Sequence, residues 1–124
     1  MGLFRKIFGK RENPDPQWQL PLVQEVGIAI IHLIPEEWSS AYLVLEIGEN
    51  GLGNGLSHSA ITPQLNKDMK LQDGRFVTPD ITIMAATRQL ELGWLERKGW
   101  FKRAIISVVK DGEDWQVQSQ YEYE

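Results

Sequence analysis

The chain has 124 residues, 42% of them hydrophobic, and it contains no cysteine. This length suits one domain with one core and excludes a multidomain enzyme, and the lack of cysteine excludes disulfides, thiolate metal sites and a cysteine nucleophile. The net charge of −4 argues against binding nucleic acid over the whole surface, because such binding depends on clustered lysine and arginine. The compartment we expect is the cytoplasm.

The charge is distributed unevenly along the chain. Residues 1–12 carry +3 and the remaining residues carry −7. Apolar residues in this basic stretch recur at the spacing of one helix face, which predicts a basic amphipathic leader over residues 1–16 ahead of a single domain over 17–124. Two interpretations of the leader stay open, namely folding against its own domain and contact with an anionic membrane or a partner groove. The residues that would make such a contact are Leu3, Phe4, Arg5, Lys6, Ile7 and Phe8.

The first half of the domain predicts a helix and a hairpin. An apolar helical stripe runs from Pro21 to Ile34, and Pro35 should end the helix before it. Residues 41–47 are short and apolar, as in a largely buried strand. Residues 48–55 hold four of the eleven glycines and two Asn-Gly pairs but lack the spacing of a phosphate-binding loop. We therefore expect a hairpin loop with positive φ at its Asn-Gly turns, followed by a strand over 56–62.

The second half predicts a long helix followed by two strands. Residues 67–72 and 75–78 could form a short hairpin, and Thr78 is a candidate N-cap with Pro79 in the first helical turn. The helix that follows has apolar residues on two faces, which implies burial on more than one side, and Gly99 should stop it. Strands over 100–110 and 115–123 follow. The order predicts an α+β fold in which a mostly antiparallel sheet packs against an N-terminal and a central helix, with a C-terminal hairpin.

Side chains that could perform catalysis are scarce. The only histidines are His32, inside the first helix, and His58. Ser57 and His58 are neighbours in a predicted strand, so their side chains point to opposite faces and cannot form a nucleophile and base pair. No catalytic residue, metal site or cofactor is predicted, although a small hydrolase using His58 is retained as the third interpretation.

Three segments of the chain resemble the YezG-like family of immunity proteins. They are Ile34-Pro35-Glu36-Glu37-Trp38 directly after an apolar helix, the apolar run 41–47, and a closing hairpin with Asp111-Gly112 and Tyr121-Glu122-Tyr123-Glu124. The resemblance covers residues 22–124 in element order, whereas the glycine loop and the basic leader depart from the family. It implies a cytoplasmic antidote that binds the toxic C-terminal domain of a polymorphic or contact-delivered bacterial toxin, often a nuclease, encoded beside it.

The residues themselves are compatible with that function, because an acidic domain complements a nuclease whose active site is basic enough to hold phosphates. We expect stoichiometric inhibition without direct contact to nucleic acid, and the alternative is a peripheral membrane or adaptor module using the leader. An acidic edge strand kept soluble by its charge would show the same C-terminal pattern. The candidate toxin-binding residues are Glu36, Glu37, Glu46, Glu49, Asp111, Glu113, Asp114, Trp115, Tyr121, Glu122, Tyr123 and Glu124.

Overall fold

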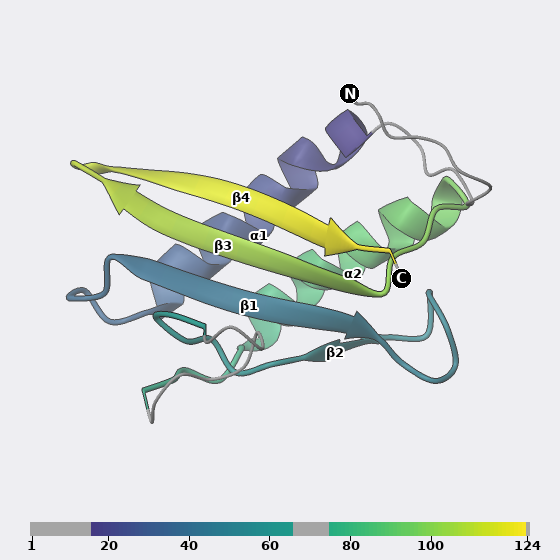
Figure 1. Cartoon of the computed structure of the whole chain (residues 1–124), viewed down its shortest axis with the longest axis horizontal. Coiled ribbons are helices and arrows are strands. Elements are labelled where there is room, and N and C mark those ends of the chain that lie inside the picture. Colours follow the sequence, from purple (N-terminus) through teal and green to yellow (C-terminus); the bar gives the residue numbers. More distant parts are fainter. Residues whose placement is uncertain (1–15, 66–74, 124) are drawn as a thin grey trace.

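The computed structural model of the chain describes residues 16–65 and 75–123, and in it two helices lie behind one face of an antiparallel sheet (Figure 1). A short 3-10 helix, η1 (Pro16–Gln19), leads into α1 (Leu20–Leu33), and strands β1 (Ser40–Ile47) and β2 (Leu56–His58) follow. Helix α2 (Ile81–Glu96) and strands β3 (Arg103–Asp111) and β4 (Asp114–Glu122) complete the order. The strand order across the sheet is β2-β1-β3-β4. The predicted α+β fold with a C-terminal hairpin is confirmed.

The core lies between the helices and the two central strands. Alternate residues of β1 and β3 face the helices, and the register pairs Leu43 with Ile106 across the two strands. The fully buried residues of the two strands are Ala41, Leu43, Leu45, Ala104, Ile106 and Val108, and the helices contribute Val26, Ile30, Ile83, Leu90 and Trp94. The opposite face of the two central strands is also partly covered, since Val44 and Ile105 are buried there, which agrees with the prediction of a largely buried strand over residues 41–47.

Helix α1 matches its prediction to within one residue at each end. Pro21 lies in its first turn, and the residue after its last turn, Ile34, has an extended backbone as expected before Pro35. The helix lies very close to β4 at Gly27, where a Cβ would sit only 2.5 Å from Cγ2 of Val117. Glycine at this position therefore sets how closely α1 packs on the sheet.

Helix α2 begins and ends differently from the sequence prediction. Its N-cap is Asp80, whose side chain accepts a hydrogen bond from the backbone N–H of Ile83 at 3.0 Å, so the prediction of Thr78 as cap is wrong. At the other end the residue with positive φ is Lys98, at 58°, and Gly99 instead donates its N–H to the carbonyl of Trp94 at 2.9 Å. The helix therefore ends as predicted near Gly99, but the residue in the left-handed conformation of its C-terminal motif is Lys98 and not the glycine.

Only one long face of α2 is buried, against the prediction of burial on more than one side. Ile83, Leu90 and Trp94 are fully buried, whereas a second stripe of apolar side chains lies at the surface. These exposed residues are Ile81, Met84, Leu92 and Leu95. Both helices pack on the same face of the sheet, so α2 buries the side that faces the sheet and its second apolar stripe stays in solvent.

Two predicted segments fall outside the described residues. They are the leader, apart from the start of η1, and the first strand of the hairpin expected around 67–78. In the part that is described, Val77 pairs with Ile61 in an isolated antiparallel bridge, so this segment extends the sheet beyond β2.

Candidate functional site

The turn between α1 and β1 places two carboxylates at the surface. Trp38 is buried, with 8% of its surface exposed, and its backbone N–H donates to the carbonyl of Pro35 at 3.1 Å, which closes a tight turn. Glu36 and Glu37 occupy the middle of that turn and are exposed. The Ile-Pro-Glu-Glu-Trp block is therefore a helix stop and a core anchor that together hold two acids in solvent.

The β3–β4 hairpin turn lies beside this first turn, at the left of Figure 1. The N–H of Lys110 donates to the carbonyl of Ser39 at 2.8 Å, which joins the two turns. Asp111 and Asp114 pair across a two-residue turn in which Gly112 has a φ of 66°. We refer to the exposed carboxylates of the two turns as the acidic end: Glu36, Glu37, Asp111, Glu113 and Asp114.

The acidic end has few internal partners. Within residues 16–65 and 75–123, one side-chain hydrogen bond to a carboxylate of this set is found, from the Gln116 amide to Asp111 at 3.3 Å, and no cation of these residues forms a salt bridge with any of the five. Lys110 instead lies 6.0 Å from the ring of Trp115, which is half-buried at the start of β4. The result is a strongly negative surface with an aromatic side chain at its border.

The other candidate acids lie at the opposite end of the sheet. Arg103 of β3 lies between Glu46 of β1 at 3.2 Å and Glu122 of β4 at 3.3 Å. Glu49 is exposed in the glycine loop, and Glu124 is outside the described residues. Because β4 rises about 3.3 Å per residue, the two ends lie roughly 26 Å apart, and the predicted residues do not form one patch.

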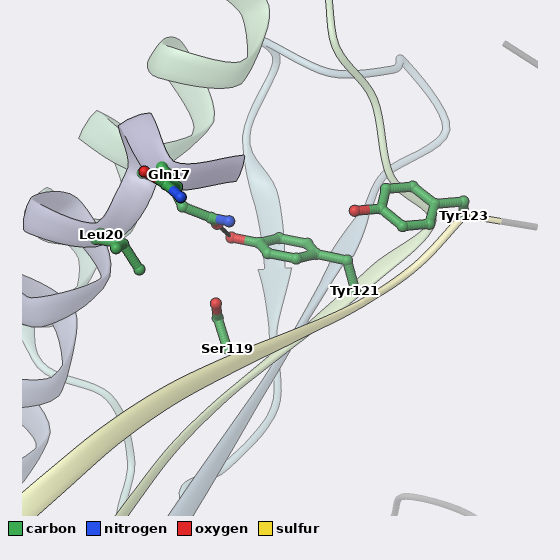
Figure 2. A pocket seen from close by; sticks show the side chains of 6 residues that line it. Gln17, Leu20, Ser119, Tyr121 and Tyr123 are labelled. Carbon is green, nitrogen blue, oxygen red and sulfur yellow. Dashed lines mark hydrogen bonds between the residues drawn. The ribbon is translucent and has the colours of Figure 1, made fainter. Parts of the chain in front are cut away.

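The two C-terminal tyrosines differ in their surroundings. The Tyr121 ring lies 5.1 Å from Trp94 and 5.3 Å from Phe101, its hydroxyl donates to Oε1 of Gln19, and burial raises its pKa to about 12. Tyr123 is exposed and stacks on Tyr121 at 6.3 Å. Both border a shallow pocket of about 300 Å³ between the start of α1 and the end of β4 (Figure 2). Its lining consists of Gln17, Gln19, Leu20, Ser119, Tyr121 and Tyr123.

The glycine loop is fixed by a buried acid that the sequence reasoning missed. Glu91 of α2 is 1% exposed, and its Oε2 accepts from the backbone N–H of Gly53 at 2.7 Å and of Gly55 at 3.0 Å. Its Oε1 accepts from Arg88 at 2.9 Å. Glu91 therefore satisfies two backbone N–H groups of the glycine loop. The feature of the sequence that could have indicated its burial is its place on the same helix face as the apolar Leu90 and Trp94.

The loop differs in detail from the expected Asn-Gly hairpin. In the described residues it is the glycines Gly51, Gly53 and Gly55 that have positive φ, at 85°, 100° and 102°, and neither asparagine does. The strands it joins form an antiparallel hairpin as predicted, with Ile47 opposite Leu56, but the second strand ends at His58. The rest of the strand predicted over 56–62 makes only isolated bridges, from Thr62 to Tyr42 and from Ile61 to Val77.

His58 is held in place by packing and hydrogen bonds. Its Nε2 lies 2.7 Å from Oγ1 of Thr87 and its Nδ1 lies 3.0 Å from the carbonyl of Leu56. Burial lowers the pKa of His58, which favours a neutral ring whose Nδ1–H donates to the carbonyl of Leu56. The Thr87 hydroxyl beside Nε2 donates to the carbonyl of Met84 at 3.1 Å. Ser57 is exposed on the other side of the strand, as predicted. This geometry ties β2 to α2.

Neither a family model nor a curated protein matches the chain. The resemblance to YezG-like immunity proteins therefore stays a prediction based on the residues that carry it.

The membrane interpretation depends on Leu3 to Phe8, which lie outside the described residues. Within residues 16–65 and 75–123, no helix is both long and apolar enough to cross a bilayer.

Proposed function

We propose that this chain is an immunity protein that binds a basic bacterial toxin domain through the acidic end and blocks it by forming a one-to-one complex. The observation that carries the proposal is the convergence of five exposed carboxylates from two turns more than seventy residues apart in sequence, joined by the Ser39–Lys110 hydrogen bond. The proposed partner is the toxin domain encoded beside this chain, with a nuclease as the class that fits the charge.

Electrostatics supports this choice of partner. Like charges held close together repel one another and destabilise the compact state, and a cationic partner removes that repulsion on binding. A nuclease must present lysine and arginine to hold phosphates, so its substrate-binding surface is cationic. A complementary acidic surface speeds association with such a partner and competes with nucleic acid for the same cations.

The surroundings of the acidic end suit a protein interface. Charge alone gives rate and orientation, whereas affinity requires apolar area that is removed from water. Trp115 is half-buried next to the carboxylates and is anchored by its packing against the core. Tryptophan is among the residue types that contribute most to binding at protein interfaces.

The test uses an inactive variant of the neighbouring toxin domain, with association measured by stopped flow between low and physiological salt. We expect Glu36→Gln, Glu37→Gln and Glu113→Gln combined to slow association at least tenfold and to weaken its salt dependence. Glu25→Gln combined with Glu96→Gln, at exposed helix positions, is the control and should leave the rate unchanged. A toxin domain that forms no complex with the intact protein, and is not neutralised by it in cells, would overturn the proposal.

A further inference from the structure

One long edge of the sheet carries backbone groups without partners in the described structure. Strand β4 pairs only with β3, and the carbonyl of Glu122 accepts from Lys102 N–H at 2.7 Å, on the β3 side. Successive residues of a strand alternate in the direction of their backbone groups. The N–H and C=O groups that face the open edge are therefore those of Trp115, Val117, Ser119 and Tyr121.

This edge lacks the features that normally prevent strand pairing. Its register with β3 runs unbroken over nine residues, so it contains no bulge, and it has no proline. No charged residue lies between Trp115 and Tyr121. Proteins usually protect an exposed edge with short strands, bulges, prolines or inward charges. At the opposite edge, β2 has only three residues and the segment after it is paired further on by the Ile61–Val77 bridge.

The charges at the two ends of β4 determine what can pair with it. Asp114 begins the strand and Glu122 ends it. A second copy pairing antiparallel along the full length of the same edge would place Asp114 opposite Glu122 of that copy at both ends. Like charges directly opposite are destabilising, although Arg103 offsets part of the charge of Glu122. An extended segment with lysine or arginine near each end and uncharged residues between them would meet opposite charges instead.

We propose that the open edge of β4 accepts such a segment of the toxin domain as a fifth strand, so that backbone hydrogen bonds supply affinity that the acidic end does not. This inference rests on the proposed function and adds the geometry of the complex. Strand addition to an exposed edge is a general mode of peptide recognition in which backbone pairing gives affinity and side-chain pockets give specificity.

The pocket beside the second half of β4 would provide that specificity. Figure 2 shows Ser119 and Tyr121 of β4 facing Gln17 and Leu20, with the pocket between them. Amides, hydroxyls and one leucine line it, and it contains no charged side chain. A residue of the added strand that points to the helix side at this level would enter the pocket. The lining fits an uncharged side chain with an apolar stem and a hydrogen-bonding tip.

The test is amide hydrogen exchange of the intact protein, alone and with the inactive toxin domain. In the free protein we expect the amides of Val117 and Ser119 to exchange much faster than that of Gln118, whose N–H faces β3. In the complex, the exchange of Val117 and Ser119 should slow at least tenfold. A complex that forms without protecting these two amides would overturn strand addition while leaving the proposed function intact. Protection already present in a dimeric free protein would show that a second copy occupies the edge, and would overturn it too.

A backbone substitution provides the second test. Ser119→Pro removes an outward N–H without removing a bond to β3, and edge strands accept proline at such positions. We expect it to weaken toxin binding about tenfold, the effect of one or two lost hydrogen bonds. Ser119→Ala, which also removes the pocket hydroxyl but keeps the backbone N–H, is the matched control. Thermal unfolding checks that both variants are folded, and equal binding by a folded Ser119→Pro variant would contradict the inference.

Discussion

The backbone N–H of Lys110 donates to the carbonyl oxygen of Ser39 at 2.8 Å, and this bond joins the turn after α1 to the β3–β4 hairpin. Next to it, Trp38 anchors the same turn in the core. Backbone and apolar contacts thus position the acidic end, while its carboxylates point into solvent. Folding and the proposed binding therefore depend on different atoms of the same turn and can be separated by mutation.

The first prediction separates them. Glu36→Gln with Glu37→Gln should change the free energy of unfolding by less than about 0.5 kcal/mol, because exposed side chains away from the core contribute little. Trp38→Ala should lower it by about 3 to 5 kcal/mol, because it empties a buried aromatic site. Urea unfolding measures both values. Similar losses for the two variants would show that the carboxylates themselves hold the turn.

The second prediction concerns the glycine loop. Glu91→Ala leaves the N–H groups of Gly53 and Gly55 without their acceptor, and it should lower the free energy of unfolding by about 2 to 4 kcal/mol. Glu91→Gln keeps an acceptor oxygen and should lose less. Glu96→Ala, an exposed acid of the same helix, is the control and should be nearly neutral. If Glu91→Ala left the free energy of unfolding unchanged, water would be replacing the carboxylate as acceptor without loss of stability.

These residues show how far the sequence predicts the structure. The helix before Pro35 and the alternating strand around Trp115 follow from local periodicity and turn chemistry, because each signal lies within the element it specifies. The contact of Glu91 with Gly53 spans 38 residues, and an acid in a helix resembles any solvent-facing acid until the fold buries it. The acidic end could not be predicted for the same reason, since its two turns meet only in the folded sheet.

The third prediction follows from the C-terminus of α2, where the sequence favoured the wrong residue. Lys98 holds the left-handed conformation that a residue with a Cβ adopts at a cost of about 1 kcal/mol. Lys98→Gly should therefore stabilise the protein by up to about 1 kcal/mol, in spite of the greater freedom of glycine in the unfolded chain. Lys98→Ala removes the same side chain but keeps the strain, so it should not stabilise. Thermal unfolding of the two variants distinguishes these outcomes.

The fourth prediction tests the close approach of α1 to β4. Gly27→Ala places a Cβ against Val117, and the crowding, about 1 to 3 kcal/mol, should outweigh the helix propensity of about 1 kcal/mol that alanine gains. Val117→Ala removes the two methyl groups that crowd this Cβ. A double-mutant cycle should therefore give a favourable coupling of about 1 to 2 kcal/mol. If the effects of the two substitutions on the free energy of unfolding were additive, α1 would be able to move away from the sheet without loss of stability.

The last prediction concerns pH. Burial raises the pKa of Tyr121 to about 12, above the usual value of 10 for tyrosine in an unfolded chain. Above pH 10 the unfolded chain therefore releases this proton while the folded protein keeps it, so stability falls as the pH rises. The loss is absent below pH 10 and should reach about 2 kcal/mol by pH 12.

Lysines titrate in the same range, so the useful quantity is the difference in free energy of unfolding between wild type and Tyr121→Phe. Near pH 7 the variant should be less stable by about 1 to 2 kcal/mol, because Gln19, itself buried, loses its hydroxyl partner. Phenylalanine cannot ionise, so the difference should shrink between pH 10 and 12 and then vanish or reverse. If the stabilities of wild type and Tyr121→Phe change in parallel over that interval, the Tyr121 hydroxyl is in contact with water, and the pocket beside β4 is hydrated at this residue.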